Sequence, residues 1–134
     1  MSLYFFKQQE TIRVLTIKNK NMKKIIINLP MYDMGLTVAF GSESELGNCF
    51  PKLSFKKKGC FIPKKNLICI VQRRGTLRED YISSVVHEVN HFVEHQAMRK
   101  GFMEEMEHKA YLSGYLVKEI YRGLFKSSSN KKEA

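Results

Sequence analysis

The chain has 134 residues, of which 43% are hydrophobic, so we expect one compact domain with a single core and no second domain. Its net charge of +10 and pI near 9.6 favour polyanions or acidic substrates only in a general way. Lysine and arginine are spread over residues 18–24, 52–65 and 73–78 and over the end of the chain, without the aromatic interleaving of a nucleic-acid-binding platform. This pattern argues against specific binding to nucleic acid.

Three cysteines, Cys49, Cys60 and Cys69, form no C-x-x-C pair. They predict neither a disulfide framework nor a cysteine zinc site, and they suit a reducing compartment. No run approaches the roughly 20 apolar residues that span a bilayer. The first residues also lack the cleavage site of a signal peptide. We therefore expect a cytoplasmic protein with no membrane partner.

Residues 1–21 are expected to be an N-terminal extension. Ile12, Val14 and Ile17 are apolar and fit a strand over residues 11–17. Met22 and the lysines after it would equally suit a natural chain start, in which case the extension is dispensable.

A β-hairpin is predicted next. Residues 25–29 are mostly β-branched and apolar, residues 36–40 are apolar again, and turn-forming residues separate the two runs. The polar residues 42–47 predict one helical turn. Residues 49–65 contain two prolines, a glycine and six lysines, which indicates a basic loop with a short edge strand around Phe61.

Residues 66–72 form a continuous apolar run that predicts a strand in the middle of the sheet. It leads into a helix over residues 78–100, with Thr76 as its N-cap and Gly101 at its end. A second helix is predicted over residues 103–125. Its predicted apolar stripe, whose three-four spacing suits packing against another helix and whose methionines are core filler, is Met103, Met106, Ala110, Ser113, Val117, Ile120 and Leu124.

The first of these helices contains the motif His-Glu-x-x-His at residues 87–91. The four-residue spacing puts His87 and His91 on one helical face, about 6 Å apart along the axis, which suits one Zn²⁺. Glu88 lies about 100° further round, where it suits a general base better than a third ligand. Because the histidines lie opposite the apolar stripe, a merely polar helix face is the alternative interpretation. Such faces, however, are usually filled by Lys, Glu, Gln or Arg.

Hydrolytic zinc takes three protein ligands and leaves one position open. His95 lies roughly 12 Å along the axis from His87, too far for both to bind one ion. Ala97 stands where longer motifs have a third histidine. The remaining candidates, all near the start of the second helix, are Glu104, Glu105, Glu107 and His108. Geometry favours Glu107 only modestly, because it flanks the predicted stripe.

The motif, a glycine turn and the segment Glu-His-Lys-Ala-Tyr-Leu-Ser-Gly-Tyr-Leu at residues 107–116 resemble small gluzincin-type zinc metallopeptidase-like proteins of phages, prophages and mobile elements. In that group an E-x-x-A-Y-L-x-G-x-L segment on the helix after the motif supplies a glutamate ligand. Ile-Asn-Leu-Pro-Met-Tyr at residues 27–32, followed by Leu-Thr-Val at 36–38, is similar to the group's first hairpin. The resemblance spans residues 22–125.

This resemblance implies that His87, His91 and Glu107 bind zinc and that Glu88 is the general base. Ala110 and Gly114 would be small so that the two helices can approach each other. Tyr111, one turn beyond Glu107, would either support the ligand or the oxyanion, or pack in the core.

The implied fold is an α+β, zincin-like minimal domain over residues 22–125, followed by a disordered polar tail at 126–134. A small mixed sheet would pack on the motif helix, and an edge strand would hold an extended peptide or protein substrate by backbone pairing. The implied activity is hydrolysis of a peptide amide bond. Two alternatives remain: a non-proteolytic metal-binding structural or regulatory module, and a basic nucleic-acid-associated protein. An open pocket over the metal would favour the enzyme, and a sealed site the module.

Overall fold

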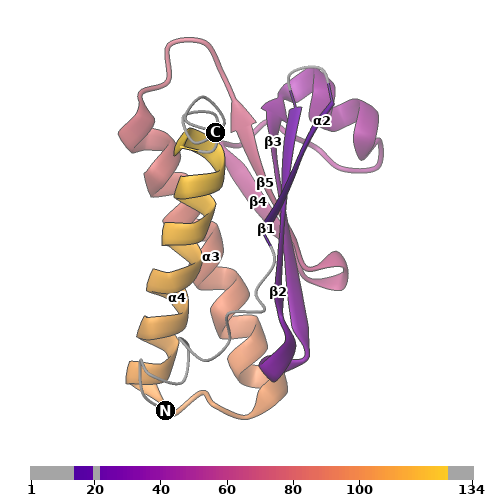
Figure 1. The fold of residues 1–134 in the computed structure, drawn as a ribbon. Helices are drawn as coiled ribbons and strands as arrows, with labels where there is room; N and C mark the ends of the chain where they lie inside the picture. Colours follow the sequence, from indigo (N-terminus) through magenta and orange to yellow (C-terminus); the bar gives the residue numbers. More distant parts are fainter. Residues whose placement is uncertain (1–13, 20–21, 127–134) are drawn as a thin grey trace.

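The computed structural model describes residues 14–19 and 22–126, which form a mixed α+β fold (Figure 1). The strands are β1 (Val14–Asn19), β2 (Met22–Leu29), β3 (Met34–Ser42), β4 (Gly59–Ile62) and β5 (Leu67–Gln72). The α-helices are α2 (Glu43–Cys49), α3 (Arg78–Lys100) and α4 (Met106–Tyr121), and a π-helical turn, Arg122–Lys126, continues α4.

The strands form one five-stranded sheet in the order β1-β2-β3-β5-β4. β3 and β5 are parallel, and the other neighbours are antiparallel. β5 therefore lies inside the sheet, as its continuous apolar sequence predicts, and five of its six residues are buried. β4 is the edge strand expected around Phe61.

Two hairpins of this sheet use the same kind of turn. Pro30 begins a 3₁₀ turn that ends at Asp33, and Pro63 begins another that ends at Asn66. Asp33 and Asn66 adopt left-handed backbone angles, with φ of 50° and 47°. Proline fixes the first φ of such a turn, and Asp and Asn tolerate the left-handed region, so the local sequence accounts for both turns. The second turn holds β4 in place beside β5.

Helices α3 and α4 lie side by side on one face of the sheet, and α2 lies on the other (Figure 1). The larger core is between the sheet and the two long helices; it includes Ile25, Ile27, Val38, Ile70, Val89, Phe92 and Leu116. The smaller core lies under α2 and the loop after it; it includes Met22, Leu46, Phe55 and Cys69. α2 is longer than the single turn expected, and Ser42 and Glu45 form a complete capping box at its start.

The predicted N-cap of the motif helix is wrong. The helix begins at Arg78, its N-cap is Leu77, and no side chain caps it. Thr76 instead donates its backbone N–H to the Arg73 carbonyl in the preceding turn. The Tyr81 hydroxyl accepts from the Arg73 N–H at 3.0 Å and donates to the Arg73 carbonyl at 2.9 Å, which ties the end of β5 to α3. The other end is as predicted, since Gly101 takes φ 82° and closes the helix.

The apolar stripe predicted for the second helix is wrong over its first half, whereas Val117 packs against the larger core beside α3, as a stripe that faces another helix should. α4 begins at Met106, and its buried residues are His108, Leu112, Leu116, Glu119 and Ile120. Met103 and Met106 are 39% and 75% exposed, so they are not core filler. Of the predicted stripe, Ile120 and Leu124 are buried. The true stripe is shifted by one residue, about 100° around the helix.

The predicted strand at residues 11–17 is found in part, as β1, while residues 11–13 lie outside the described residues. The polar tail predicted to be disordered also lies outside them, apart from Lys126. Within the described residues, no helix is long and apolar enough to cross a membrane.

Candidate metal centre

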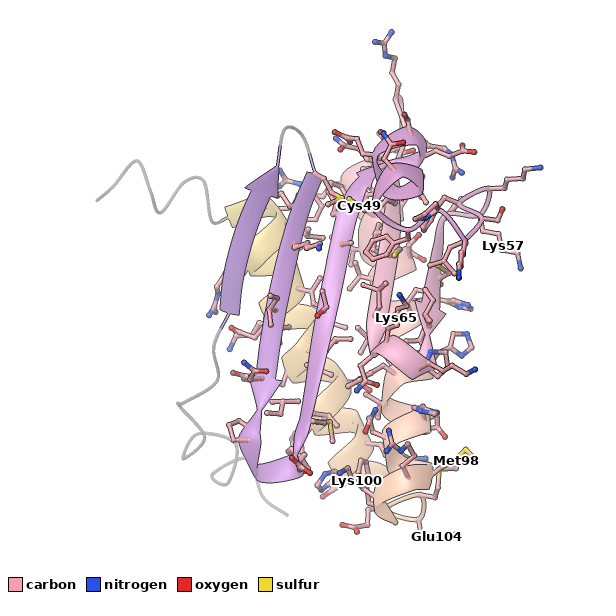
Figure 2. The ribbon with its side chains drawn as sticks, turned by 90° about the vertical axis from the view of Figure 1, so that its right-hand side faces the viewer. Cys49, Lys57, Lys65, Met98, Lys100 and Glu104 are labelled. Atoms are coloured by element: carbon pink, nitrogen blue, oxygen red, sulfur yellow. The ribbon has the colours of Figure 1, made fainter. Side chains whose placement is uncertain are left out.

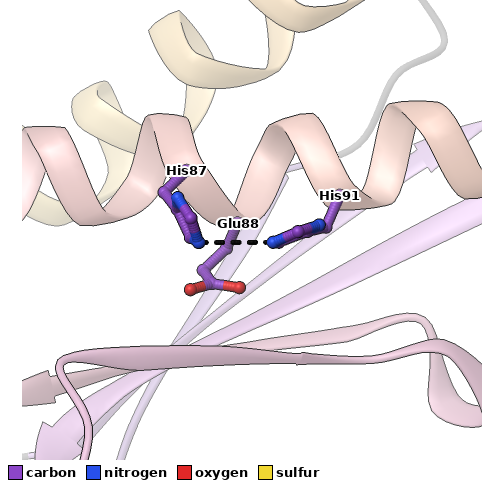
Figure 3. Close-up of side chains that lie close together, drawn as sticks. All are labelled: His87, Glu88 and His91. Atoms are coloured by element: carbon purple, nitrogen blue, oxygen red, sulfur yellow. Dashed lines mark hydrogen bonds between the residues drawn. The ribbon is translucent and has the colours of Figure 1, made fainter.

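The two motif histidines point their Nε2 atoms at each other. Figure 3 shows His87 and His91 leaving α3 on the same side, and their Nε2 atoms are 3.2 Å apart. Two ligands on one tetrahedral zinc, with bonds of 2.0–2.1 Å, lie about 3.3 Å apart. The nitrogen atoms are therefore already at the separation that one zinc ion requires.

The position of α3 explains why the two histidine side chains are exposed and can face each other. Val85, Val89 and Phe92 bury one side of the helix against the sheet, which leaves His87 and His91 exposed. The Phe61 ring of β4 packs edge-on against Phe92 at 5.9 Å between ring centroids. The sheet edge thus holds the helix while the two imidazoles remain accessible.

Glu88 completes the cluster from a buried position. It is 6% exposed, and one ligand atom of each of His87, Glu88 and His91 lies within 4.8 Å of the others. Burial raises the pKa of the Glu88 carboxyl above its usual value, and the nearby His87, His91 and Lys57 oppose this effect. A desolvated carboxylate with a raised pKa is a stronger base than an exposed one.

The edge strand passes directly under Glu88. A Cβ atom at Gly59 would lie 3.4 Å from Glu88 Cγ and 3.0 Å from the carbonyl oxygen of Cys69. Glycine at this position therefore lets the strand approach the carboxylate closely. The sequence presents Gly59 as one glycine in a basic loop, and only the pairing of β4 with β5 places it here.

Two hollows open beside the cluster, and both are lined by Lys57, Gly59, His87 and Glu88. Their volumes are about 290 and 530 Å³. A ligand that occupied them would reach the histidine nitrogens from solvent. Such access from solvent is what a catalytic metal site needs for its open position.

The structure does not bring Glu107 to this cluster. Within the described part of the chain, the group suited to a metal ion consists of His87, Glu88 and His91. Glu107 is exposed in the first turn of α4, which begins close to the end of α3 at Lys100. His91 lies nine residues before that end, about 14 Å along the axis. Glu107 as a ligand therefore stays a prediction.

The other candidate metal ligands on and near α4 also lie outside the cluster. His108 is 4% exposed and packs against Phe102 and Tyr32, with ring centroids 4.6 and 5.3 Å away. Burial lowers the pKa of its imidazole. Glu104 and Glu105 are exposed, and a carboxylate oxygen of Glu105 lies 3.9 Å from His108 Nδ1. His108 therefore belongs to the core.

Tyr111 is 40% exposed, so the alternative that it packs in the core is wrong. Ala110 is exposed as well, and Gly114 lines a shallow apolar hollow with Val86 and Asn90 of α3. Gly114 is exposed too, and a Cβ atom there would meet no other atom within 4 Å, so the expectation that Ala110 and Gly114 must be small for the helices to approach is wrong. His95 lines the larger hollow with its ring against Phe61, at 5.8 Å between centroids, outside the cluster.

Comparisons with known protein families, with curated proteins and with solved structures find no match to this chain.

Proposed function

We propose that this protein is a zinc-dependent peptidase with a zincin-like domain. The observation that carries the proposal is the 3.2 Å separation of the His87 and His91 Nε2 atoms, next to a buried Glu88 and an open hollow. The resemblance to gluzincin-type proteins adds the reaction class.

Zn²⁺ at this position would act as a Lewis acid that polarises the substrate carbonyl and lowers the pKa of water. His87 and His91 would hold it through their Nε2 lone pairs. The Glu88 carboxylate would take the proton of the attacking water and pass it to the amine nitrogen that leaves. The resemblance alone would add Glu107 as a third ligand, whereas the cluster itself does not include it.

The edge strand supplies a way to hold the substrate. The Val71 N–H donates to the Lys58 carbonyl at 2.9 Å, so in this antiparallel pair the backbone groups of Cys60 also face β5. Those of Gly59 and Phe61 face outward from the edge. An extended peptide that paired with these two residues would lie alongside Glu88.

The test is the zinc content of the purified protein, followed by cleavage of a mixed peptide library. We expect about one zinc per chain, and Glu88→Gln should retain the zinc while losing cleavage. The matched control is Glu79→Gln, the same change at an exposed residue of α3 that lines neither hollow, and it should retain both. Wild-type protein that binds no zinc, even when zinc is supplied, would overturn the proposal.

A non-proteolytic metal-binding module is the second candidate, and one observation favours it. The Glu88 carboxylate lies close enough to both histidine nitrogens to act as a ligand itself. In that case no base would remain, and Glu88→Gln would lose zinc together with any activity. Zinc content of this one variant therefore separates the two functions.

We also infer that the protein works in the cytoplasm. The support is that Cys49, Cys60 and Cys69 are free thiols, although Cys60 and Cys69 are direct partners in the β4–β5 pairing.

A further inference from the structure

The two hollows beside the cluster extend in opposite directions along β4. Because they share Lys57, Gly59, His87 and Glu88, the candidate metal centre lies where they meet. One hollow continues beside the start of β4, and the other continues past Phe61 to Pro63 at its end. We call them together the edge groove. In Figure 2 the labelled Lys57 and Met98 both lie on the β4 side of the sheet, Lys57 toward the top and Met98 toward the bottom.

The first end of the groove is polar and basic. It is lined by Lys57, Lys58, Ser83 and Ser84, with Asp80 as the one acidic residue besides Glu88. Both lysines are exposed, and their ammonium groups are free to reach a substrate. Lys57 is close enough to lower the pKa of Glu88 by its charge. An acidic side chain is the complement of this end.

The second end of the groove is apolar. Phe61, Pro63 and Met98 line it together with the His95 ring, and Met98 is 70% exposed. The acidic residue on this side, Glu94, accepts from Lys109 Nζ at 3.0 Å, so its charge is already paired. An aromatic or large aliphatic side chain would bury apolar surface here.

The direction of β4 decides the order in which a substrate would present these side chains. β4 runs from Gly59, near the lysines, to Ile62, near Pro63. A peptide that paired antiparallel to it, the more stable arrangement, would run from the apolar end to the basic end.

We propose that the edge groove selects extended peptides with an aromatic or large aliphatic residue before the cleaved bond and an acidic residue after it. This inference rests on the proposed peptidase function and adds the class of substrate. It assigns Lys57 and Lys58 to the acidic residue, and Phe61 and Met98 to the apolar one.

The experiment measures binding and not cleavage. Zinc-loaded Glu88→Gln protein is titrated with fluorescent peptides that are identical except for Glu or Lys after the central bond, and anisotropy is recorded. We expect binding of the Glu peptide to be at least about fivefold tighter, with the difference shrinking at high salt. A third peptide with the aromatic and acidic residues exchanged should bind more weakly than the first.

Two double variants decide the question, because both change the net charge by the same amount but at different places on the protein. Lys57→Glu with Lys58→Glu should reverse the preference between the two peptides. Lys64→Glu with Lys65→Glu, in the exposed turn after β4, should leave it unchanged. If both double variants changed the preference between the two peptides equally, the preference would depend only on the net charge of the protein. That result would overturn the inference.

The outcomes separate this inference from the proposed function. Peptides that all bind without a charge preference would overturn the inference and leave a peptidase in place. Zinc-loaded protein that bound none of the peptides, and cleaved none in the wild-type form, would overturn both.

Discussion

Helices α3 and α4 cover the same face of the sheet, but they place their histidines differently. α3 carries His87 and His91 at the sheet edge, exposed and facing each other at 3.2 Å. α4 carries His108 at 4% exposure, enclosed by Tyr32 and Phe102. A histidine near a sheet edge keeps a nitrogen available to a ligand from solvent, while one on a core-facing stripe becomes part of the packing. Position in the layers, more than residue type, separates a candidate ligand from a core residue.

The largest effect expected from this comparison is on zinc binding. His91→Ala should weaken zinc binding by more than about a hundredfold, because one ligand is lost outright. His108→Ala should leave the zinc affinity within about twofold of the wild type. Zinc titration with a competing chelator measures both. If His108→Ala weakened binding as strongly as His91→Ala in protein that is still folded, the comparison between the helices would fail.

Core packing on α4 gives the next largest effect. Leu116 is fully buried in the larger core, whereas Met106 is 75% exposed. Leu116→Ala should lower the free energy of unfolding by about 2–5 kcal/mol, and Met106→Ala by less than about 0.5 kcal/mol. Urea unfolding measures both variants. If the two variants lost similar amounts of unfolding free energy, Met106 would be packed as the stripe predicted from the sequence requires.

Gly59 tests how closely the sheet edge approaches α3. Gly59→Ala places a Cβ 3.0 Å from the Cys69 carbonyl oxygen and 3.4 Å from Glu88 Cγ. We expect β4 to shift by a few tenths of an ångström and the protein to lose about 1 kcal/mol of stability. Gly47→Ala is the control, because a Cβ there has no neighbour within 4 Å. Equal stability of the two variants would argue against the close approach.

Glu107→Ala is expected to have the smallest effect. Because Glu107 is exposed and outside the cluster, its removal should leave the zinc content unchanged. The resemblance to gluzincin-type proteins predicts the opposite result, namely loss of zinc. Mass spectrometry of the intact, zinc-loaded variant decides between them. Lost zinc would mean that the first turn of α4 reaches the histidines and that the two helices share the site.

Much of this arrangement could be predicted from local sequence. The apolar runs at residues 25–29 and 36–40 lie within β2 and β3, and the run at residues 66–72 contains all of β5. The pairing of the first two follows from the Pro-x-x-Asp turn between them. The helical spacing of the motif was enough to place His87 and His91 together, because four residues on one helix are held by the backbone itself.

The sequence predicted the buried face of α4 wrongly because this helix packs against two different surfaces. α4 has apolar residues both toward the sheet, as at Leu116, and toward α3, as at Val117. Periodicity alone gives no reason to prefer one set, and the stripe chosen from the sequence was shifted by one residue. The modest geometric preference for Glu107 rested on that stripe, so the structure removes this support, and the resemblance alone remains.

The sequence by itself therefore determined the strands, the motif helix and the pair of histidines, since each depends on interactions between residues close along the chain. Tertiary structure decided that β4 packs beside α3, that Gly59 and Lys57 lie beside Glu88, and which face of α4 is buried. These depend on contacts between segments far apart in sequence. The physical reason is that the total apolar area buried by the whole sheet and both helices sets their relative positions, and no single segment contains that information.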